Sequence, residues 1–192
     1  MQFLDYKLNV KQADIAADGA FEGYASVFDT VDAQQERMAR GAFGQTLARY
    51  KQEKQWPKML WQHDPKTPIG LWDDMVEDAY GLFVRGRLLL DLHKGREAYA
   101  LLKSGVVDGL SIGYLTKQAH KEANVRVLDQ VDLFEVSLVT FMANPLAKVT
   151  TYKHWSEPYA ETVSMMNRLK VLKRAMERTD LRVKNLILES FV

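Results

Sequence analysis

The sequence predicts an α+β protein with a β-rich body and a C-terminal helical tail. Two observations lead to this prediction. Segments 81–90 and 124–141 alternate between apolar and polar side chains, as half-buried β-strands do. From residue 157 onward the apolar side chains recur at helical spacing instead. We therefore expect a body over residues 1–152, a common size for one domain, and a tail over residues 153–192.

The first half of the body is expected to contain strands and one short helix. Residues 3–28 read as strands that are broken by a turn at the Asp-Gly pair 18–19. Residues 39–51 have helical content but contain two glycines, so a short helix is expected at most. Segment 55–72 contains three prolines. We expect a strand at 59–62 that runs into a loop, because a residue before proline avoids the helical conformation.

The second half of the body is expected to hold the longer elements. Residues 81–90 are predicted as a strand, and residues 95–105 as a helix. Gly105 suits the C-terminus of that helix, because glycine adopts the left-handed conformation found there. A further strand is expected at 110–117, and the MANPLA segment 142–147 closes the body with a loop.

The predicted strand 124–141 has two chemically different faces. Successive side chains of a strand point to opposite sides. One face is expected to hold Phe134, Val136 and Leu138, and the other Leu133, Glu135 and Ser137. A carboxylate in such an apolar strand is costly unless it is paired. Glu135 is therefore either a paired, half-buried acid or a solvent-facing residue of an edge strand, and Asp132 is the competing acid.

The tail begins with an amphipathic helix. Its apolar stripe is formed by Tyr159, Val163, Met166, Leu169, Leu172 and Met176. Segment 179–192 has two interpretations. It is either a second helix capped by Thr179 or Asp180, or a strand in which Leu181 and Val183 alternate with basic residues.

Composition excludes several classes of function. The chain has 26 basic and 25 acidic residues and a net charge of +1, so its composition does not suggest the strongly basic face that nucleic-acid binding requires. Its uncharged apolar runs are too short to cross a bilayer, and the N-terminus lacks the apolar stretch of a signal peptide. It contains no cysteine, which excludes disulfides, thiolate catalysis and cysteine-based zinc sites. We expect a soluble, cytoplasmic domain whose nucleophile is Ser, Thr, Lys, Asp or Glu.

Ser111 lies in a G-x-S-x-G frame between Gly109 and Gly113. In α/β-hydrolases this frame forms a sharp turn that follows a strand and precedes a helix. Here a predicted helix precedes the serine and a β-like segment follows it, so the context is reversed. The local sequence therefore disfavours the hydrolase elbow. The two glycines would still leave room for a substrate backbone to approach Ser111.

His63 is the histidine best suited to act as a base. Leu60 and Trp61 precede it and a proline-stiffened loop follows, so its imidazole can be held in a fixed geometry. The alternative is an ordinary surface histidine beside Asp64. His120 in a polar hairpin and His93 in a solvated turn are poorer candidates. So is His154, at the entry to the tail.

Five motifs, in this order, resemble those of the phage prohead maturation protease family. These serine proteases process capsid assembly proteins in tailed bacteriophages. The motifs are FEGYASVFD (21–29), RGAFGQTL (40–47), WQHDPKTPIG (61–70), GREAYALLKSGVVDGLSIGY (95–114) and FEVSLVTFMANPLA (134–147). The family more often carries proline in place of Met142, a difference that concerns loop shape. The tail after about residue 150 is not covered by the resemblance.

The resemblance implies a fold and a catalytic site. The family is related to the herpesvirus assemblins, which have a partly closed β-barrel surrounded by helices. Their catalytic order is His, then Ser, then a third member on a following strand. His63 as base, Ser111 as nucleophile and Glu135 as third member fit that order, with Glu135 in place of the assemblins' second histidine. By analogy, the backbone around Ala143 and Asn144 would bind the oxyanion.

The resemblance also implies substrates and partners. The expected function is a serine endopeptidase that processes the phage major capsid protein or its scaffolding segment, and itself. It would act inside the prohead, which assembles in the host cytoplasm. Self-association is expected, whereas a cofactor, a metal, nucleic acid and a membrane are not. Residues 153–192 would serve dimerisation or scaffold docking, or be removed by self-cleavage; packing on their own barrel is the alternative.

Two other functions stay open. The chain could be an internal scaffold protein that keeps the protease fold and leaves its active site unused. It could also be a G-x-S-x-G esterase. The esterase predicts a helix directly after Ser111, whereas the assemblin-like protease predicts a strand.

Overall fold

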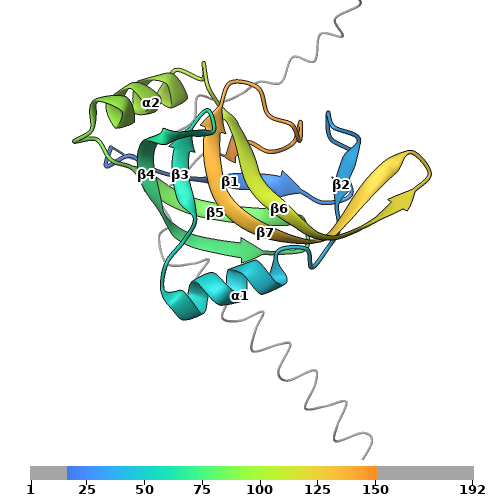
Figure 1. Cartoon of the computed structure of the whole chain (residues 1–192). Coiled ribbons are helices and arrows are strands. Elements are labelled where there is room, and N and C mark those ends of the chain that lie inside the picture. The colour runs from blue at the N-terminus through green and yellow to red at the C-terminus, as the bar shows by residue number, and fades with distance from the viewer. Residues whose placement is uncertain (1–16, 151–192) are drawn as a thin grey trace, which may run out of the picture. The chain divides into compact units, whose positions relative to one another are not determined.

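The computed structural model describes residues 17–150, which form one β-rich unit (Figure 1). Along the chain its elements are β1 (Ala20–Val27), β2 (Glu36–Met38), α1 (Gly44–Glu53), β3 (Lys58–Trp61), β4 (Asp64–Glu77), β5 (Gly81–Leu88), α2 (His93–Lys103), β6 (Gly109–Glu122), β7 (Val125–Val139) and β8 (Val149–Thr150). None of the helices in this range is long and apolar enough to cross a membrane.

The strands form one mixed, eight-stranded sheet that curls on itself. Its order is β2-β7-β3-β4-β5-β1-β8, and β6 pairs with β7. Strand β7 organises the sheet, because it is antiparallel to β6 over its whole length and parallel to two short strands. Its first half pairs with β2, and its second half with β3. Beyond the body of the sheet, β6 and β7 continue as a projecting hairpin (Figure 1).

The curled sheet closes at one end only. β8 pairs with β1, and the residues just before it reach the start of β6. The N–H of Leu110 donates to the carbonyl of Ala147, and the N–H of Tyr24 donates to that of Lys148. Residues 147–150 therefore join the two free edges at this end. The result is a partly closed barrel, and the predicted α+β class is confirmed.

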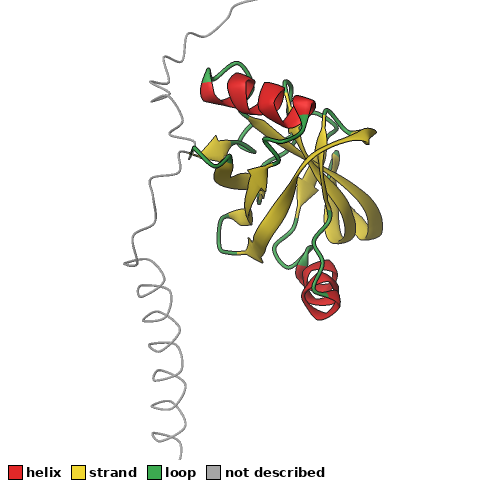
Figure 2. Cartoon of the chain, turned by 90° about the vertical axis from the view of Figure 1, so that its left-hand side faces the viewer, coloured by secondary structure: helices red, strands yellow, loops and turns green. Residues whose placement is uncertain are grey.

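Two helices cover the sheet at opposite ends (Figure 2). α1 packs against β7 and β4, and α2 packs against β4 and β5. Both helices end in the same way: the residue after the last turn has a positive φ, and two backbone hydrogen bonds close the end. At α2 that residue is Gly105 (φ 72°), as predicted, and at α1 it is Lys54 (φ 52°).

The interior of the barrel is apolar. Its largest fully buried side chains are Phe21, Phe43, Met59, Ile69, Met75, Leu82, Leu88, Leu102, Leu110, Leu128, Leu133 and Leu138. They come from α2, from Phe43 just before α1 and from most of the strands, so the alternation of apolar residues in the sequence is satisfied by one shared core. This core fixes the strands that carry the functional side chains.

The predicted loop after residue 62 is wrong. The chain makes a two-residue turn at Gln62 and His63 and returns as β4, which runs from Asp64 to Glu77. Pro65 and Pro68 are exposed and lie before the point where β4 begins to pair with β5. Prolines are tolerated at such edge positions because the missing N–H would not be used there.

The predicted faces of β7 are wrong at Phe134 and Leu133. Gly113 pairs with Glu135 and Tyr114 with Leu133, so Phe134 is an extra residue in a β-bulge. Phe134 is 51% exposed, whereas Leu133, Val136 and Leu138 are buried. The bulge shifts the alternation of buried and exposed side chains by one residue. Only the part of the prediction after residue 134 therefore agrees with the structure.

Other predicted elements agree with the structure. α1, β5 and α2 lie at or within a few residues of the predicted ranges, and β6 is longer than predicted. The turn at 18–19 is present, with a positive φ at Gly19. The short strands β2 and β8 were not predicted. Predictions for residues 3–16 and for the tail over 153–192 fall outside the described residues.

Candidate active site

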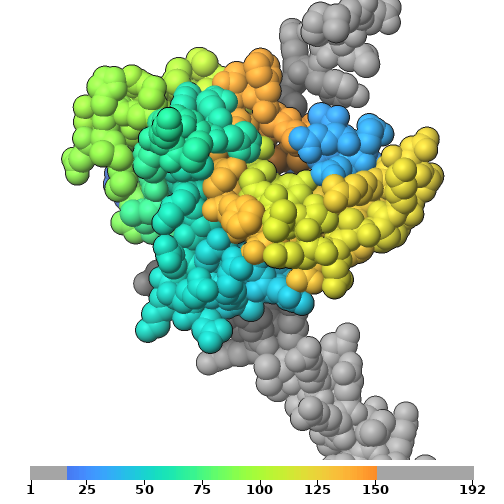
Figure 3. Space-filling model, viewed as in Figure 1, coloured from blue at the N-terminus to red at the C-terminus, as the bar shows by residue number. Residues whose placement is uncertain are grey.

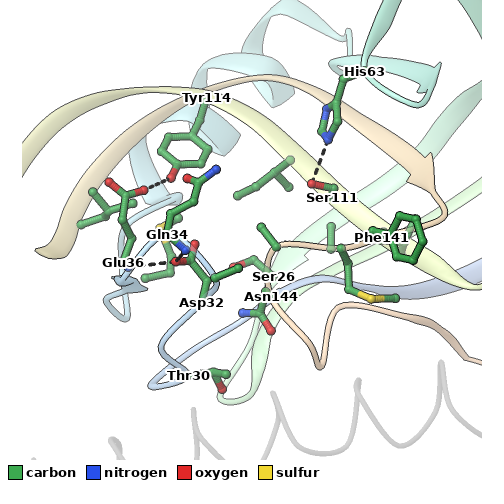
Figure 4. A pocket seen from close by; sticks show the side chains of 18 residues that line it. Ser26, Thr30, Asp32, Gln34, Glu36, His63, Ser111, Tyr114, Phe141 and Asn144 are labelled. Carbon is green, nitrogen blue, oxygen red and sulfur yellow. Dashed lines mark hydrogen bonds between the residues drawn. The ribbon is translucent and has the colours of Figure 1, made fainter. Parts of the chain in front are cut away.

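His63 lies at the tip of the β3–β4 hairpin. Gln62 and His63 both have positive φ angles, 53° and 62°. Two successive positive φ angles characterise the tightest hairpin turns, in which Asn-Gly is the favoured pair. Neither residue is glycine or asparagine, so this backbone is strained, as is common at functional sites. The turn directs the His63 side chain toward β6 and β7 (Figure 4).

Ser111 and Glu135 lie on neighbouring strands. Ser111 pairs with Ser137 in the β6–β7 register, and Gly113 pairs with Glu135. Ser111 and Glu135 therefore lie on the face opposite the core residues Leu110 and Val136. Ser111 is 8% exposed, and the Glu135 side chain is 13% exposed. The bulge at residue 134 gives Glu135 this orientation.

The three predicted side chains form one hydrogen-bonded chain. His63 Nε2 lies 3.0 Å from Ser111 Oγ, and His63 Nδ1 lies 2.6 Å from Glu135 Oε1. The geometry fits the tautomer in which Nδ1–H donates to the carboxylate and Nε2 accepts the hydroxyl proton. Figure 4 shows the contact between His63 and Ser111 at one end of a cavity. The catalytic roles of the three residues stay a prediction.

The charge on Glu135 changes the acid–base behaviour of His63. The hydrogen bond to Glu135 raises the pKa of His63 above its ordinary value, and partial burial of the ring opposes this effect more weakly. The carboxylate thus favours the protonated imidazole, which is the form that a general base acquires when it takes a proton. The His63 side chain is 44% exposed, so a substrate can reach it.

Ser137 and Gly113 surround the Glu135 carboxylate. The hydroxyl of Ser137 donates to Glu135 Oε2 at 2.5 Å and accepts the backbone N–H of His63 at 3.1 Å. Gly113 makes room for the carboxylate, because a Cβ at this position would collide with Glu135 Oε1. Both carboxylate oxygens of Glu135 are therefore hydrogen-bonded: Oε1 to His63 and Oε2 to Ser137.

A cavity of about 470 Å³ begins at Ser111 and His63. It continues between β6, the segment around β2 and the loop over residues 141–144 (Figure 3). At its far end Tyr114 donates to Glu36 at 2.6 Å (Figure 4). None of the lining residues within 17–150 is a lysine or an arginine. Phe141, at the rim, is 89% exposed. The cavity has the size of a binding cleft.

Ala143 and Asn144 line the same cavity as Ser111. The Asn144 side chain holds the loop, since Nδ2 donates to the carbonyl of Val27 and Oδ1 accepts the N–H of Leu146. Within residues 17–150, the backbone N–H groups of Ala143 and Asn144 donate to no other group. They stay the predicted oxyanion donors.

The competing acid has other partners. Asp132 pairs with Arg49 at 2.7 Å and accepts a hydrogen bond from Thr46. These contacts to α1 lower the pKa of Asp132, mainly through the hydrogen bond to Arg49. Asp132 is therefore a structural acid of the α1–β7 contact, on the far side of the bulge from Glu135.

The competing histidines also lie elsewhere. His120 is part of the projecting hairpin and contacts Asp129 and Glu122. His93 is the first residue of α2, where it is exposed and pairs with Glu97. His154 lies outside the described residues.

The strand context of Ser111 contradicts the hydrolase elbow. Ser111 is the third residue of β6, which follows α2 and runs on to Glu122. The elbow requires a helix directly after the serine. The esterase interpretation is therefore wrong on local structure.

Sequence reasoning missed the groups that support the site. Ser137 was recognised only as a neighbour of Glu135 on one face of a strand. The contact of Gln62 with Thr140, 78 residues away, was not predicted. The one sequence feature that pointed to Ser137 was its position two residues after a candidate acid. Many strands contain a serine at such a position, so the feature is not specific.

Solved structures of low sequence identity share this fold. The bacteriophage T4 capsid assembly protease has a TM-score of 0.52 at 14% identity, covering 62% of this chain and 81% of that one. The KSHV protease in complex with a hexapeptide phosphonate inhibitor has a TM-score of 0.51 at 15% identity, covering 82% of this chain and 76% of that one. The predicted herpesvirus-protease-like barrel is thus confirmed.

Relatives of known name are phage proteins. The prohead protease of Enterobacteria phage HK97 is 33% identical over 139 residues, which cover 70% of this chain and 60% of that protein. The capsid polyprotein of Pseudomonas phage PAJU2 is 34% identical over 103 residues, 49% of this chain and 15% of that protein. The chain therefore spans less than two thirds of the length of either curated relative.

A family model covers most of the body and the described site. Residues 6–162 match the model for the caudovirus prohead serine protease. This range includes His63, Ser111 and Glu135 and all the described elements. The match extends over most of the chain, and it agrees with the fold and with the named relatives. The chain belongs to the caudovirus prohead serine protease family.

Proposed function

We propose that this chain is a serine endopeptidase that uses a Ser111–His63–Glu135 triad to process capsid-associated proteins during prohead maturation. The observation that carries the proposal is the imidazole of His63. It lies within hydrogen-bond distance of the Ser111 hydroxyl on one side and of the Glu135 carboxylate on the other. A nucleophile, a base and a group that orients the base are the parts required for nucleophilic acyl transfer.

In the first step, Ser111 Oγ attacks the scissile carbonyl carbon while His63 Nε2 takes the hydroxyl proton. Glu135 stabilises the imidazolium that forms, through the hydrogen bond to Nδ1–H. The imidazolium then donates its proton to the leaving amine, and the C–N bond breaks to give an acyl-enzyme on Ser111. His63 then deprotonates a water molecule, whose oxygen attacks the acyl carbon. The ester bond to Ser111 breaks, the imidazolium returns the proton to Ser111 Oγ, and the acid product leaves.

The tetrahedral oxyanion requires donors that are in place before the reaction. The backbone N–H groups of Ala143 and Asn144 are our candidates, because both residues line the cavity with Ser111 and these N–H groups donate to no other group within residues 17–150. Asn144 fixes its loop through its side chain, so the loop is held while the N–H groups stay available.

The proposed substrates are the major capsid protein of the phage or its scaffolding segment, and the protease itself. The named relatives, a prohead protease and a capsid polyprotein, support this substrate class. We propose the interior of the prohead as the site of action. Confinement there raises the effective concentration of every substrate, so even a slow enzyme would process its neighbours. Residues 153–192 are proposed to act in self-association, scaffold docking or self-cleavage.

The test is co-expression of the chain, as wild type and as Ser111→Ala, with the capsid protein of the same phage. Intact-mass spectrometry of all products locates every cut. We expect cleavage by the wild type only. Cleavage by purified Ser111→Ala would reject the serine mechanism, and activity that depends on a metal, tested with a chelator, would also count against it. If neither version cleaves any chain in assembled proheads, the scaffold function becomes the better interpretation.

A further inference from the structure

Ser137 occupies the centre of the contact between the hairpin turn and β7. It is fully buried on β7, opposite Ser111 in the β6–β7 register. Its hydroxyl has both hydrogen-bonding directions in use: Oγ–H donates to Glu135 Oε2, and Oγ accepts the N–H of His63. One buried hydroxyl therefore contacts both partners of the imidazole–carboxylate pair.

The His63 turn depends on contacts to β7. Positive φ at two successive residues that are not glycine is unfavourable, so surrounding contacts must hold the turn. Within residues 17–150, three sets of such contacts reach β7 and Thr140. The N–H of Gln62 donates to the carbonyl of Leu138, and the Gln62 side chain exchanges two hydrogen bonds with Thr140. The N–H of His63 donates to Ser137, which is the only one of these contacts that reaches the catalytic residue itself.

The Glu135 carboxylate depends on the same hydroxyl. Oε1 accepts from His63 and Oε2 accepts from Ser137, so the two hydrogen bonds together fix the plane of the carboxylate. Gly113 leaves room for the carboxylate, because it has no side chain. Without the Ser137 donor, the one hydrogen bond within residues 17–150 that opposes rotation of the carboxylate is the bond to the imidazole that it must orient.

We propose that Ser137 is a positioning residue of the protease: it couples the backbone of His63 to the carboxylate of Glu135 and so sets the geometry of the imidazole. The inference rests on the proposed function of the triad. It adds a residue that does not touch substrate and acts through its two neighbours. Misplacement of a catalytic group by about 1 Å can cost on the order of 100-fold in rate.

The expected effect of Ser137→Ala is a fall in kcat of roughly 10- to 100-fold with little change in KM. The probe is a synthetic peptide that spans a capsid-protein site mapped by the co-expression experiment. The variant is expected to fold, because Gln62 still holds the turn through Leu138 and Thr140. If its melting temperature falls strongly, Ser137→Cys, which keeps a side chain of similar size with a weaker donor, takes its place.

Thr46 provides a matched control. It is also a buried hydroxyl, and it also joins a carboxylate to a backbone N–H: Oγ1 donates to Asp132 and accepts from the N–H of Leu133. It lies at the α1–β7 contact, away from the candidate site. Thr46→Val removes the same kind of hydrogen bonds, so it is expected to lower stability and leave kcat unchanged.

A double-mutant cycle separates positioning from a general structural role. If Ser137 acts through the triad, Ser137→Ala costs little once Glu135→Gln has disrupted the pair, and the two losses are far from multiplicative. Multiplicative losses, a wild-type kcat in Ser137→Ala, or an equal fall in Thr46→Val would each overturn the proposal. An active Ser111→Ala would instead overturn the proposed function, so the two failures are distinguishable.

Discussion

Two acids three residues apart on β7 have different surroundings. Asp132 faces α1, where Arg49 and Thr46 contact it, whereas Glu135 faces the hairpin turn. In the β6–β7 register Asp132 pairs with Leu115 and Glu135 with Gly113, so the extra residue Phe134 places both acids on the same face of β7. Their surroundings therefore differ because of their positions along the strand. Sequence alternation alone leaves both acids open, and the hydrogen bonds distinguish them.

Glu135→Gln is expected to lower kcat by about 10³- to 10⁴-fold. The neutral amide lacks the negative charge that stabilises the imidazolium, and it does not hold His63 in the tautomer with the proton on Nδ1. The measurement is steady-state hydrolysis of the mapped peptide. Asp132→Asn serves as control, with a small loss of stability and a kcat close to that of the wild type. A large loss in Asp132→Asn together with normal turnover in Glu135→Gln would reverse the assignment.

The pH dependence follows from the raised pKa of His63. The base must be neutral, so kcat/KM is expected to fall on the acid side with a midpoint above the ordinary histidine value of about 6.5. Protonated His63 stabilises the folded state below about pH 6.5, and this stability is lost as the pH rises through the folded pKa. Activity and this part of the stability therefore change in opposite directions.

A pH–rate profile of the free enzyme tests this expectation. In Glu135→Gln the carboxylate that raises the pKa of His63 is absent, so the acid limb is expected to move to lower pH. An acid limb that stays in place in Glu135→Gln would show that another group sets it. His120, whose pKa is raised by Asp129 and Glu122, is the first group to test, by His120→Gln.

The sequence predicted the three residues of the candidate site, which the structure brings together, but not the residues that contact them. His63, Ser111 and Glu135 were found because residue type, order and motif context all restrict them. Ser137 and Gln62 were not found, because their roles depend on contacts between distant segments, such as Gln62 with Thr140. Serine and glutamine are also common in strands and turns, so their presence alone carries no signal.

At the scale of elements, the errors come from local backbone features. The hairpin turn at Gln62 and His63 lacks the Asn-Gly pair that marks such turns, so β4 was predicted as a loop. The bulge at Phe134 has no sequence signature of its own. The helix α2 was found because Gly105 marks its end, whereas Lys54 hides the equivalent end of α1.

The two helix ends predict opposite effects of substitution. Lys54 and Gly105 both have positive φ, and the same pair of backbone hydrogen bonds closes each helix. Lys54→Gly relieves the left-handed strain and is expected to add about 0.5–1 kcal/mol of stability. For a chain of this size that raises the melting temperature by about 1–4 °C.

Gly105→Lys is the mirror control and is expected to lower the melting temperature by a similar amount. A Cβ at Gly105 would meet no neighbouring atom within 4 Å, so backbone strain is the main cause of the expected loss of stability. Thermal unfolding followed by circular dichroism measures both variants. If both substitutions changed the melting temperature in the same direction, the positive φ would not explain their effects.

At the scale of the whole molecule, the described unit contains every part of the candidate site. His63, Ser111 and Glu135 lie on the β3–β4 turn, β6 and β7. The barrel closes through residues 147–150, which bind the edges of β1 and β6. The last described strand therefore ends the sheet and is needed for its closure, and the division predicted at residue 152 falls just beyond it.

A chain that ends after residue 152 is expected to keep its melting temperature and its turnover of the mapped peptide. The reason is that β8 and its contacts to β1 stay in place. A chain that ends after Pro145 is the control. It lacks the fully buried Ala147, the ion pair of Lys148 with Asp108 and the whole of β8, so its barrel loses closure next to Ser111.

We expect this shorter chain to unfold at a lower temperature and to lose activity. Thermal unfolding and peptide turnover are measured on both truncated chains and on the full chain. A chain ending after residue 152 that keeps its melting temperature but loses turnover would assign residues 153–192 to the active enzyme, through self-association or substrate docking. A chain that keeps turnover of the peptide but no longer cuts capsid protein in assembled proheads would assign them to docking alone.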